Sequence, residues 1–160
     1  MDMKIVLAYD RLDDIRQLFC EYTAMLVETD ETVKSCLAAQ GYGDELDHVE
    51  EKYGLPDGRL YGLCRDDGQL AGCAAIHRLD ERCCELKRLY VRPEYRGQGL
   101  SRLLMEQCIG DARRIGYQYM RLDTLPFMTA AMSLYKEYGF YEIPPYYDNP
   151  IPAIFMQKDL

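Results

Sequence analysis

The stretch from residue 82 to residue 125 constrains the fold most, because strand and helix patterns follow one another in it without a break. Residues 82–91 (RCCELKRLYV) form a strand pattern, and a loop with two glycines follows. Apolar residues then recur at helical spacing from Leu100 to Ile115, and residues 117–125 (YQYMRLDTL) form another strand pattern. A strand–helix–strand unit predicts a right-handed crossover between two parallel strands of one sheet.

The other segments predict antiparallel strands and further helices around this unit. Residues 59–65 and 69–79 flank the turn DDG and predict a hairpin, which the strand at 82–91 extends. Strand patterns also lie at 4–9, 140–143 and 153–160, and helical patterns lie at 12–26, 30–41, 44–53 and 126–138. The 160 residues contain no linker or repeat, so we expect residues 1–160 to form a single domain. Its class is α/β (α+β), with helices on both faces of one mixed, mostly antiparallel sheet.

The charge balance narrows the set of partners. The chain has 19 lysines and arginines against 27 aspartates and glutamates, which is a net charge of −8. Nucleic-acid binding needs a basic face, so we expect no nucleic-acid partner. No run reaches the ~20 apolar residues of a membrane span. The start, MDMKIVLAYD, lacks the segments of a signal peptide, so we expect a cytoplasmic protein without a membrane partner; a homodimer stays open.

The cysteines and histidines form no metal-binding pattern. Seven cysteines include no CxxC pair, and the two histidines are His48 and His77. We therefore expect no metal, and free thiols that are mostly buried. The adjacent Cys83 and Cys84 suggest covalent catalysis as an alternative, but neither has a histidine close in sequence to activate it.

The loop before the helix at 100–115 has the features of an anion site. It comprises Arg96, Gly97, Gln98, Gly99, Leu100 and Ser101. A dinucleotide fingerprint needs a third glycine where Arg102 stands, and a nucleotide P-loop needs a GK[ST] sequence that is absent. Glycines in front of a helix start can still present backbone N–H groups to a pyrophosphate. A plain strand-to-helix turn is the alternative.

Two motifs at this separation resemble the GNAT superfamily of N-acetyltransferases. The loop is similar to the family's R-x-x-G-x-[GA] motif, with Ser101 where the family has Gly or Ala. Residues 130–143 (AAMSLYKEYGFYEI) are similar to a second motif, A-x-x-LY-x-x-x-GF. The strand ending at Val91 also resembles the family's fourth strand. The resemblance covers residues 60–160 well and the first 58 residues only in element order.

The resemblance implies a GNAT fold, with a sheet of about seven strands that is splayed between strands 4 and 5. It implies acetyl-CoA as the acyl donor, with its pyrophosphate on residues 96–101. The pantetheine arm would add to an open strand edge along Leu89, Tyr90 and Val91. A backbone N–H near Leu89 would stabilise the oxyanion. Thr129 stands near a position where relatives often carry an asparagine that contacts the coenzyme.

Glu85 is the candidate general base. Strand alternation places it on the same face as Leu89 and Val91, and it lies 11 residues before Arg96, a spacing seen in family members with a glutamate base. An acceptor amine with a pKa of ~10.4 must lose a proton before it attacks. Partial burial can raise a glutamate pKa to ~6–7, which suits a base. A simple ion pair with a neighbouring cation is the alternative.

Tyr135 is the candidate general acid, because the family's tyrosine at this position protonates the departing thiolate. Packing in the core beside Leu134 and Tyr138 is the alternative. Four further tyrosines lie in segments that can wall an acceptor pocket: Tyr22, Tyr42, Tyr146 and Tyr147. For each of them taken alone, an amphipathic surface position is the simpler interpretation.

These residues predict an acyltransferase that moves an acetyl group from acetyl-CoA to a primary amine by direct attack in a ternary complex. The acceptor is a small molecule or a peptide, and the sequence does not choose between them. A module that binds acyl-CoA without transfer is an alternative from a different class. An acetyltransferase acting on proteins or peptides is another.

Overall fold

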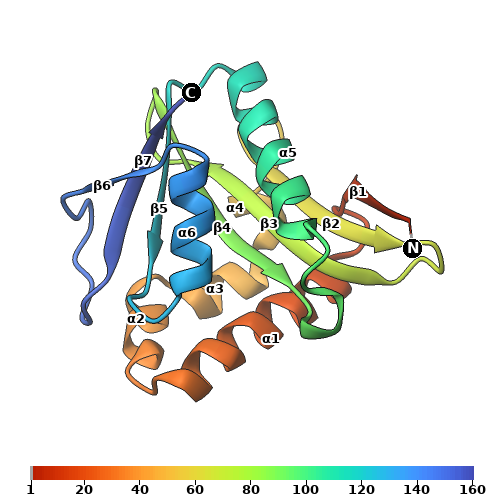
Figure 1. The fold of residues 1–160 in the computed structure, drawn as a ribbon, viewed down its shortest axis with the longest axis horizontal. Coiled ribbons are helices and arrows are strands. Elements are labelled where there is room, and N and C mark those ends of the chain that lie inside the picture. Colours follow the sequence, from red (N-terminus) through yellow and green to blue (C-terminus); the bar gives the residue numbers. More distant parts are fainter. Residues whose placement is uncertain (1) are drawn as a thin grey trace.

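The computed structural model describes residues 2–160, which form a seven-stranded sheet in the order β1-β2-β3-β4-β5-β7-β6 with helices on both faces (Figure 1). The strands are β1 (Met3–Leu7), β2 (Arg59–Arg65), β3 (Leu70–Arg78), β4 (Cys83–Val91), β5 (Tyr119–Thr124), β6 (Tyr141–Ile143) and β7 (Ile154–Asp159). The helices are α1 (Leu12–Thr29), α2 (Val33–Ala39), α3 (Tyr42–Asp47), α4 (Val49–Lys52), α5 (Leu100–Ile115) and α6 (Thr129–Glu137), with a 3-10 turn at Pro93–Tyr95.

The pairing of the strands confirms the expected fold class. Strands β4 and β5 are parallel and are joined through α5, as the strand–helix–strand pattern predicts. All other neighbouring strands are antiparallel. The last predicted helix begins at Thr129 rather than at Pro126, because residues 126 and 127 form a turn before it.

Two apolar clusters cover the two faces of the sheet. On one face, α5 buries Leu104, Met105 and Cys108 against strand residues such as Leu86 and Met120. On the other face, α1 buries a cluster that includes Ile15, Leu18 and Phe19 against β2 and β3. Both clusters are fully closed to solvent at their centres, so the sheet is a rigid platform for the groups at its edges.

Strands β4 and β5 pair only over their first three residues within the described chain. Their pairing runs from Cys83 opposite Tyr119 to Glu85 opposite Arg121 and ends there. Strand β4 continues to Val91 and β5 to Thr124, and Figure 1 shows the two strands diverging beyond this point. We call the open part the fork. The splayed sheet that the GNAT resemblance implies is thereby confirmed.

A bulge in β4 lies at the fork and changes the direction of its side chains. Arg88 has a left-handed φ of 58°, and the register with β3 shifts between Cys73 and Ala75 opposite it. Cys84, Leu86 and Val91 all belong to the cluster under α5, and Leu89 packs against it, so even-numbered residues face α5 before the bulge and odd-numbered ones after it. The expected placement of Glu85 on the face of Leu89 and Val91 is therefore wrong, because the bulge inserts an extra residue between them.

An ion pair holds the bulge against α3. The guanidinium of Arg88 donates from Nε to Oε2 of Glu45 at 2.9 Å and from Nη2 to Oε1 at 3.0 Å. Lys52 donates to Glu45 at 2.7 Å, and Arg88 lies 5.0 Å from the ring of Tyr42. Burial raises the pKa of Glu45, but Arg88 and Lys52 outweigh it and lower the pKa to about 2. The carboxylate therefore stays charged and fixes an otherwise strained backbone.

Replacing Glu45 by Gln should destabilise the protein by about 3–5 kcal/mol, because Arg88 is then left buried without a countercharge. Urea unfolding at neutral pH measures this change. The matched control is Glu137→Gln, which breaks the ion pair of Arg102 and Glu137 on the exposed surface, and it should cost at most about 1 kcal/mol. Equal effects of the two substitutions would show that the bulge does not depend on this pair.

Candidate active site

A groove of about 540 Å³ runs from the fork along the loop before α5. The ends of β4 and the first turns of α5 and α6 line it, together with α1 residues Tyr22, Met25 and Leu26. Of the loop residues predicted to bind a ligand, Arg96, Gly97, Gly99, Leu100 and Ser101 line the groove, as do Leu89, Tyr90 and Val91. Gln98 is exposed and does not line it.

The two loop glycines give the groove its shape. Gly97 and Gly99 have φ values of 80° and 75°, which a residue with a Cβ adopts only under strain. A Cβ at either position would meet no protein atom within 4 Å, so the space in front of both is open to a ligand. Gly99 also precedes the first turn of α5, whose free N–H groups and positive dipole end favour an anion there.

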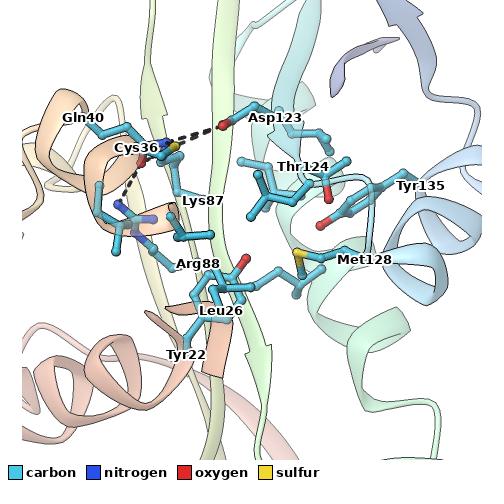
Figure 2. A pocket seen from close by; sticks show the side chains of 16 residues that line it. Tyr22, Leu26, Cys36, Gln40, Lys87, Arg88, Asp123, Thr124, Met128 and Tyr135 are labelled. Atoms are coloured by element: carbon cyan, nitrogen blue, oxygen red, sulfur yellow. Dashed lines mark hydrogen bonds and ion pairs between the residues drawn. The ribbon is translucent and has the colours of Figure 1, made fainter. Parts of the chain in front are cut away.

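A smaller cavity of about 50 Å³ lies within the fork. Figure 2 shows that Cys36, Gln40, Lys87 and Arg88 approach it from one side and Asp123, Thr124 and Tyr135 from the other. Five residues line both this cavity and the groove: Tyr22, Leu26, Leu89, Met128 and Tyr135. We call this smaller space the fork cavity, and a ligand lying in the groove would reach it at Tyr135.

Tyr135 combines the two interpretations that the sequence left open. Its ring packs in the core with Phe140 at 5.8 Å between centroids, and its side chain also lines the fork cavity and the groove. Burial raises the pKa of Tyr135 above its usual 10, so the phenol carries its proton at neutral pH. It can therefore donate a proton to a group at the junction.

Glu85 lies at the start of the fork, but its carboxylate does not line the fork cavity. Oε1 accepts from His77 Nε2 at 2.7 Å, and Oε2 accepts from the Tyr146 hydroxyl at 2.6 Å. Burial raises the pKa of Glu85, but the charge of Lys87 and the contacts with His77 and Tyr146 outweigh it and lower the pKa to about 2. The expected rise to about 6–7 is therefore wrong, because hydrogen-bond donors and a cation surround the carboxylate.

His77 is the cross-strand partner of Glu85. The two residues are directly opposite in β3 and β4. Nδ1 of His77 faces the carbonyl oxygen of Arg78 at 3.1 Å, and that oxygen can only accept. Nε2 faces Glu85 Oε1 at 2.7 Å, so both ring nitrogens of His77 contact an oxygen atom. The sequence assigned no role to His77, and the structure shows that it contacts one carboxylate oxygen of Glu85.

Asp123 is a carboxylate that does line the fork cavity, and the sequence analysis did not single it out. Its Oδ2 accepts from the Tyr147 hydroxyl at 2.6 Å and from Gln40 at 3.4 Å, and its Oδ1 lies 3.8 Å from Lys87 Nζ. A carboxylate near the end of a predicted strand was the available signal. Its significance depends on the fork, which no local pattern shows.

Of the four tyrosines considered for the wall of an acceptor pocket, Tyr22 lines the fork cavity and the groove, whereas Tyr42, Tyr146 and Tyr147 line neither. Tyr42 stacks on Arg88, and Tyr146 and Tyr147 bind Glu85 and Asp123. The adjacent thiols of Cys83 and Cys84 are buried instead, and burial raises the pKa of Cys83 to about 11. A thiol in that state is a poor nucleophile, which disfavours the covalent alternative.

Comparison with known proteins agrees with this geometry. The model of the acetyltransferase (GNAT) family matches residues 13–140. An uncharacterized N-acetyltransferase of Schizosaccharomyces pombe is 39% identical over 151 residues, which cover 93% of this chain and 88% of that protein. The chain therefore belongs to the GNAT family, and it is an acyl-CoA-dependent N-acetyltransferase.

Solved structures share the fold over the whole chain. A GNAT-family acetyltransferase from Staphylococcus aureus superposes with a TM-score of 0.81 at 19% identity, covering 99% of each chain. An N-acetyltransferase from Thermoplasma acidophilum, solved in complex with coenzyme A, superposes with a TM-score of 0.73 at 19% identity, covering 100% of each chain. At these identities the likeness establishes the fold. Among residues 2–160, no helix is long and apolar enough to cross a membrane.

The lowered pKa of Glu85 predicts a specific dependence of stability on pH. A carboxylate with a folded pKa of about 2 contributes stability that is complete above its unfolded pKa and is lost as the pH falls through the folded value. Glu85→Gln should therefore destabilise the protein by on the order of 3 kcal/mol at neutral pH, and the difference should shrink between about pH 5 and pH 2.

Urea unfolding of both proteins over this pH range measures the difference. Effects of acid on the remaining carboxylates occur in both proteins and cancel. A difference that stays constant down to pH 2 would contradict the charged, hydrogen-bonded state of Glu85.

Proposed function

We propose that the protein transfers an acetyl group from acetyl-CoA to a primary amine by direct attack in a ternary complex. The observation that carries this proposal is the meeting of the groove and the fork cavity at Tyr135. The groove suits a long anionic donor, and the fork cavity suits the amine end of an acceptor. The thioester carbon of the donor and the amine would then approach each other within a largely buried site.

The donor side is supported by the open edge of β4. Beyond Glu85, this strand has no partner among residues 2–160 on the side of β5, so its N–H and C=O groups on that side can pair with an extended amide chain. The pantetheine arm of the coenzyme is such a chain. Its pyrophosphate would lie at Gly97 and Gly99, and a backbone N–H near Leu89 would stabilise the oxyanion.

The acceptor side favours a small amine over a cationic peptide. The fork cavity has a volume of about 50 Å³, and the buried cations Lys87 and Arg88 lie in its wall with Tyr22 and Tyr135. These two cations are compensated, because Arg88 pairs with Glu45 and Lys87 lies 3.8 Å from Asp123, so the size of the cavity carries the choice: it fits the end of a small molecule rather than a peptide segment. The protein or peptide acceptor stays as the second candidate.

Two carboxylates compete for the role of base. Glu85 is the residue that the sequence indicates, but both of its oxygens already accept hydrogen bonds and it lies outside the fork cavity. Asp123 lines the cavity, and within the described residues its Oδ1 accepts no hydrogen bond and lies 3.8 Å from Lys87 Nζ. We therefore favour Asp123 as the group that takes the proton of the amine. Tyr135 would give its proton to the departing thiolate.

The function is tested by release of coenzyme thiol from acetyl-CoA in the presence of a panel of primary amines. We expect release that depends on the acceptor. Binding of acetyl-CoA by calorimetry without any acceptor-dependent release would favour the module that binds acyl-CoA without transfer. The absence of any binding would refute both.

Gly99→Ala should weaken acetyl-CoA binding at least roughly tenfold, because a side chain strains the left-handed backbone and blocks close approach of the pyrophosphate. Calorimetry measures the affinity. Gly68→Ala is the matched control, since Gly68 has a φ of 84° and an equally open surrounding, but lies in the turn between β2 and β3. A similar loss of affinity in both variants would show that backbone strain alone is responsible.

Asp123→Asn should lower turnover at neutral pH by about 10²- to 10⁴-fold and recover part of it at alkaline pH, where the acceptor loses its proton unaided. Glu85→Gln should keep the pH profile of the wild type, although it lowers stability. The rate of thiol release between pH 6 and pH 10 decides between them. The reverse pattern would restore Glu85 as the base.

A further inference from the structure

Thr124, the last residue of β5, carries a buried hydroxyl with no hydrogen-bond partner in the described part of the chain. The residue is 5% exposed. Buried hydroxyls nearly always find a partner, because an unpaired one loses its bonds to water without replacement. A valine of the same shape would avoid this loss, so the hydroxyl calls for an explanation beyond packing.

Thr124 is one of the residues that line the fork cavity. Met120 and Leu122 belong to the cluster under α5, so strand alternation directs Thr124 to the same face and Asp123 to the opposite one. Tyr135 lies on this face, and Figure 2 shows the hydroxyls of Thr124 and Tyr135 directed toward one another. The side chains of Leu89, Leu125 and Met128 make this part of the wall apolar.

Two hydroxyls in an apolar wall form a site for a group on which negative charge develops. In the proposed reaction that group is the coenzyme sulfur. When the amine nitrogen bonds to the acetyl carbon, the C–S bond breaks and its electron pair moves to sulfur. Tyr135 then transfers its proton to the sulfur, and the proton lost by the amine to Asp123 restores the phenol through solvent. The products are the amide and the free thiol.

We propose that Thr124 is a second hydroxyl donor to the coenzyme sulfur, beside Tyr135. Its Oγ1–H would stabilise the thiolate before the proton of Tyr135 arrives, and it keeps its own proton throughout. This inference rests on the proposed function, because it assigns the sulfur of the donor to the junction of the groove and the fork cavity. It also accounts for a hydroxyl that gains its partner only when the coenzyme is bound.

The test compares Thr124→Val, which removes the hydroxyl at nearly constant shape, with Thr124→Ser, which retains it. Binding of coenzyme A and of desulfo-coenzyme A, which lacks the sulfur, is measured by calorimetry. Thr124→Val should weaken binding of coenzyme A roughly 2- to 10-fold and leave binding of desulfo-coenzyme A unchanged. Thr124→Ser should match the wild type with both compounds.

Turnover supplies an independent measurement. Thr124→Val should lower kcat with little change in the KM for the acceptor, as Tyr135→Phe should, while its melting temperature stays equal to or above that of the wild type. Equal losses for the two coenzymes, or no loss for either, would overturn the inference. If the wild type binds coenzyme A but transfers nothing, the proposed function fails, and the comparison of the two coenzymes still decides whether Thr124 meets the sulfur.

Discussion

The bidentate ion pair between Arg88 and Glu45 is the interaction on which the geometry of the fork depends. It holds a left-handed arginine in the middle of a strand, where the backbone alone would not stay. A bulge bends its strand, and within the described residues the pairing of β4 with β5 ends at Glu85, just before the bulge. Both charges are buried, so the loss of either one would leave the other without a countercharge. The pair therefore stabilises the backbone conformation of the bulge.

The fork brings chemistry from distant parts of the chain into one space. Gln40 follows α2, Lys87 comes from β4, Asp123 from β5 and Tyr135 from α6, and all four line the fork cavity. The groove meets this cavity from the side of the α5 N-terminus. The proposed function uses both spaces, with the diphosphate of the donor in the groove and its thioester at the junction with the fork cavity.

Local sequence patterns correctly predicted features that depend on nearby residues, such as the backbone conformation of the loop before α5. The glycines at 97 and 99 adopt the left-handed backbone that only glycine takes freely, so their spacing already indicated an anion loop. Tyr135 was also found from its motif, and it does reach the junction. The placement of Glu85 failed, because strand alternation assumes an unbroken ladder and the bulge at Arg88 interrupts it. The predicted rise of the Glu85 pKa was wrong because His77 and Tyr146 each contact one of its carboxylate oxygens.

By itself the sequence determined the order of the elements, the parallel crossover through α5, the two-glycine loop before α5 and the membership of the family, since these follow from periodicity and from contiguous motifs. Only the tertiary structure decided which carboxylate lines the fork cavity and that the buried hydroxyl of Thr124 has no hydrogen-bond partner within residues 2–160. The reason is physical. The direction of a side chain at a bulge, and the partners of a buried polar group, are set by residues far away in the chain, and no local pattern carries that information.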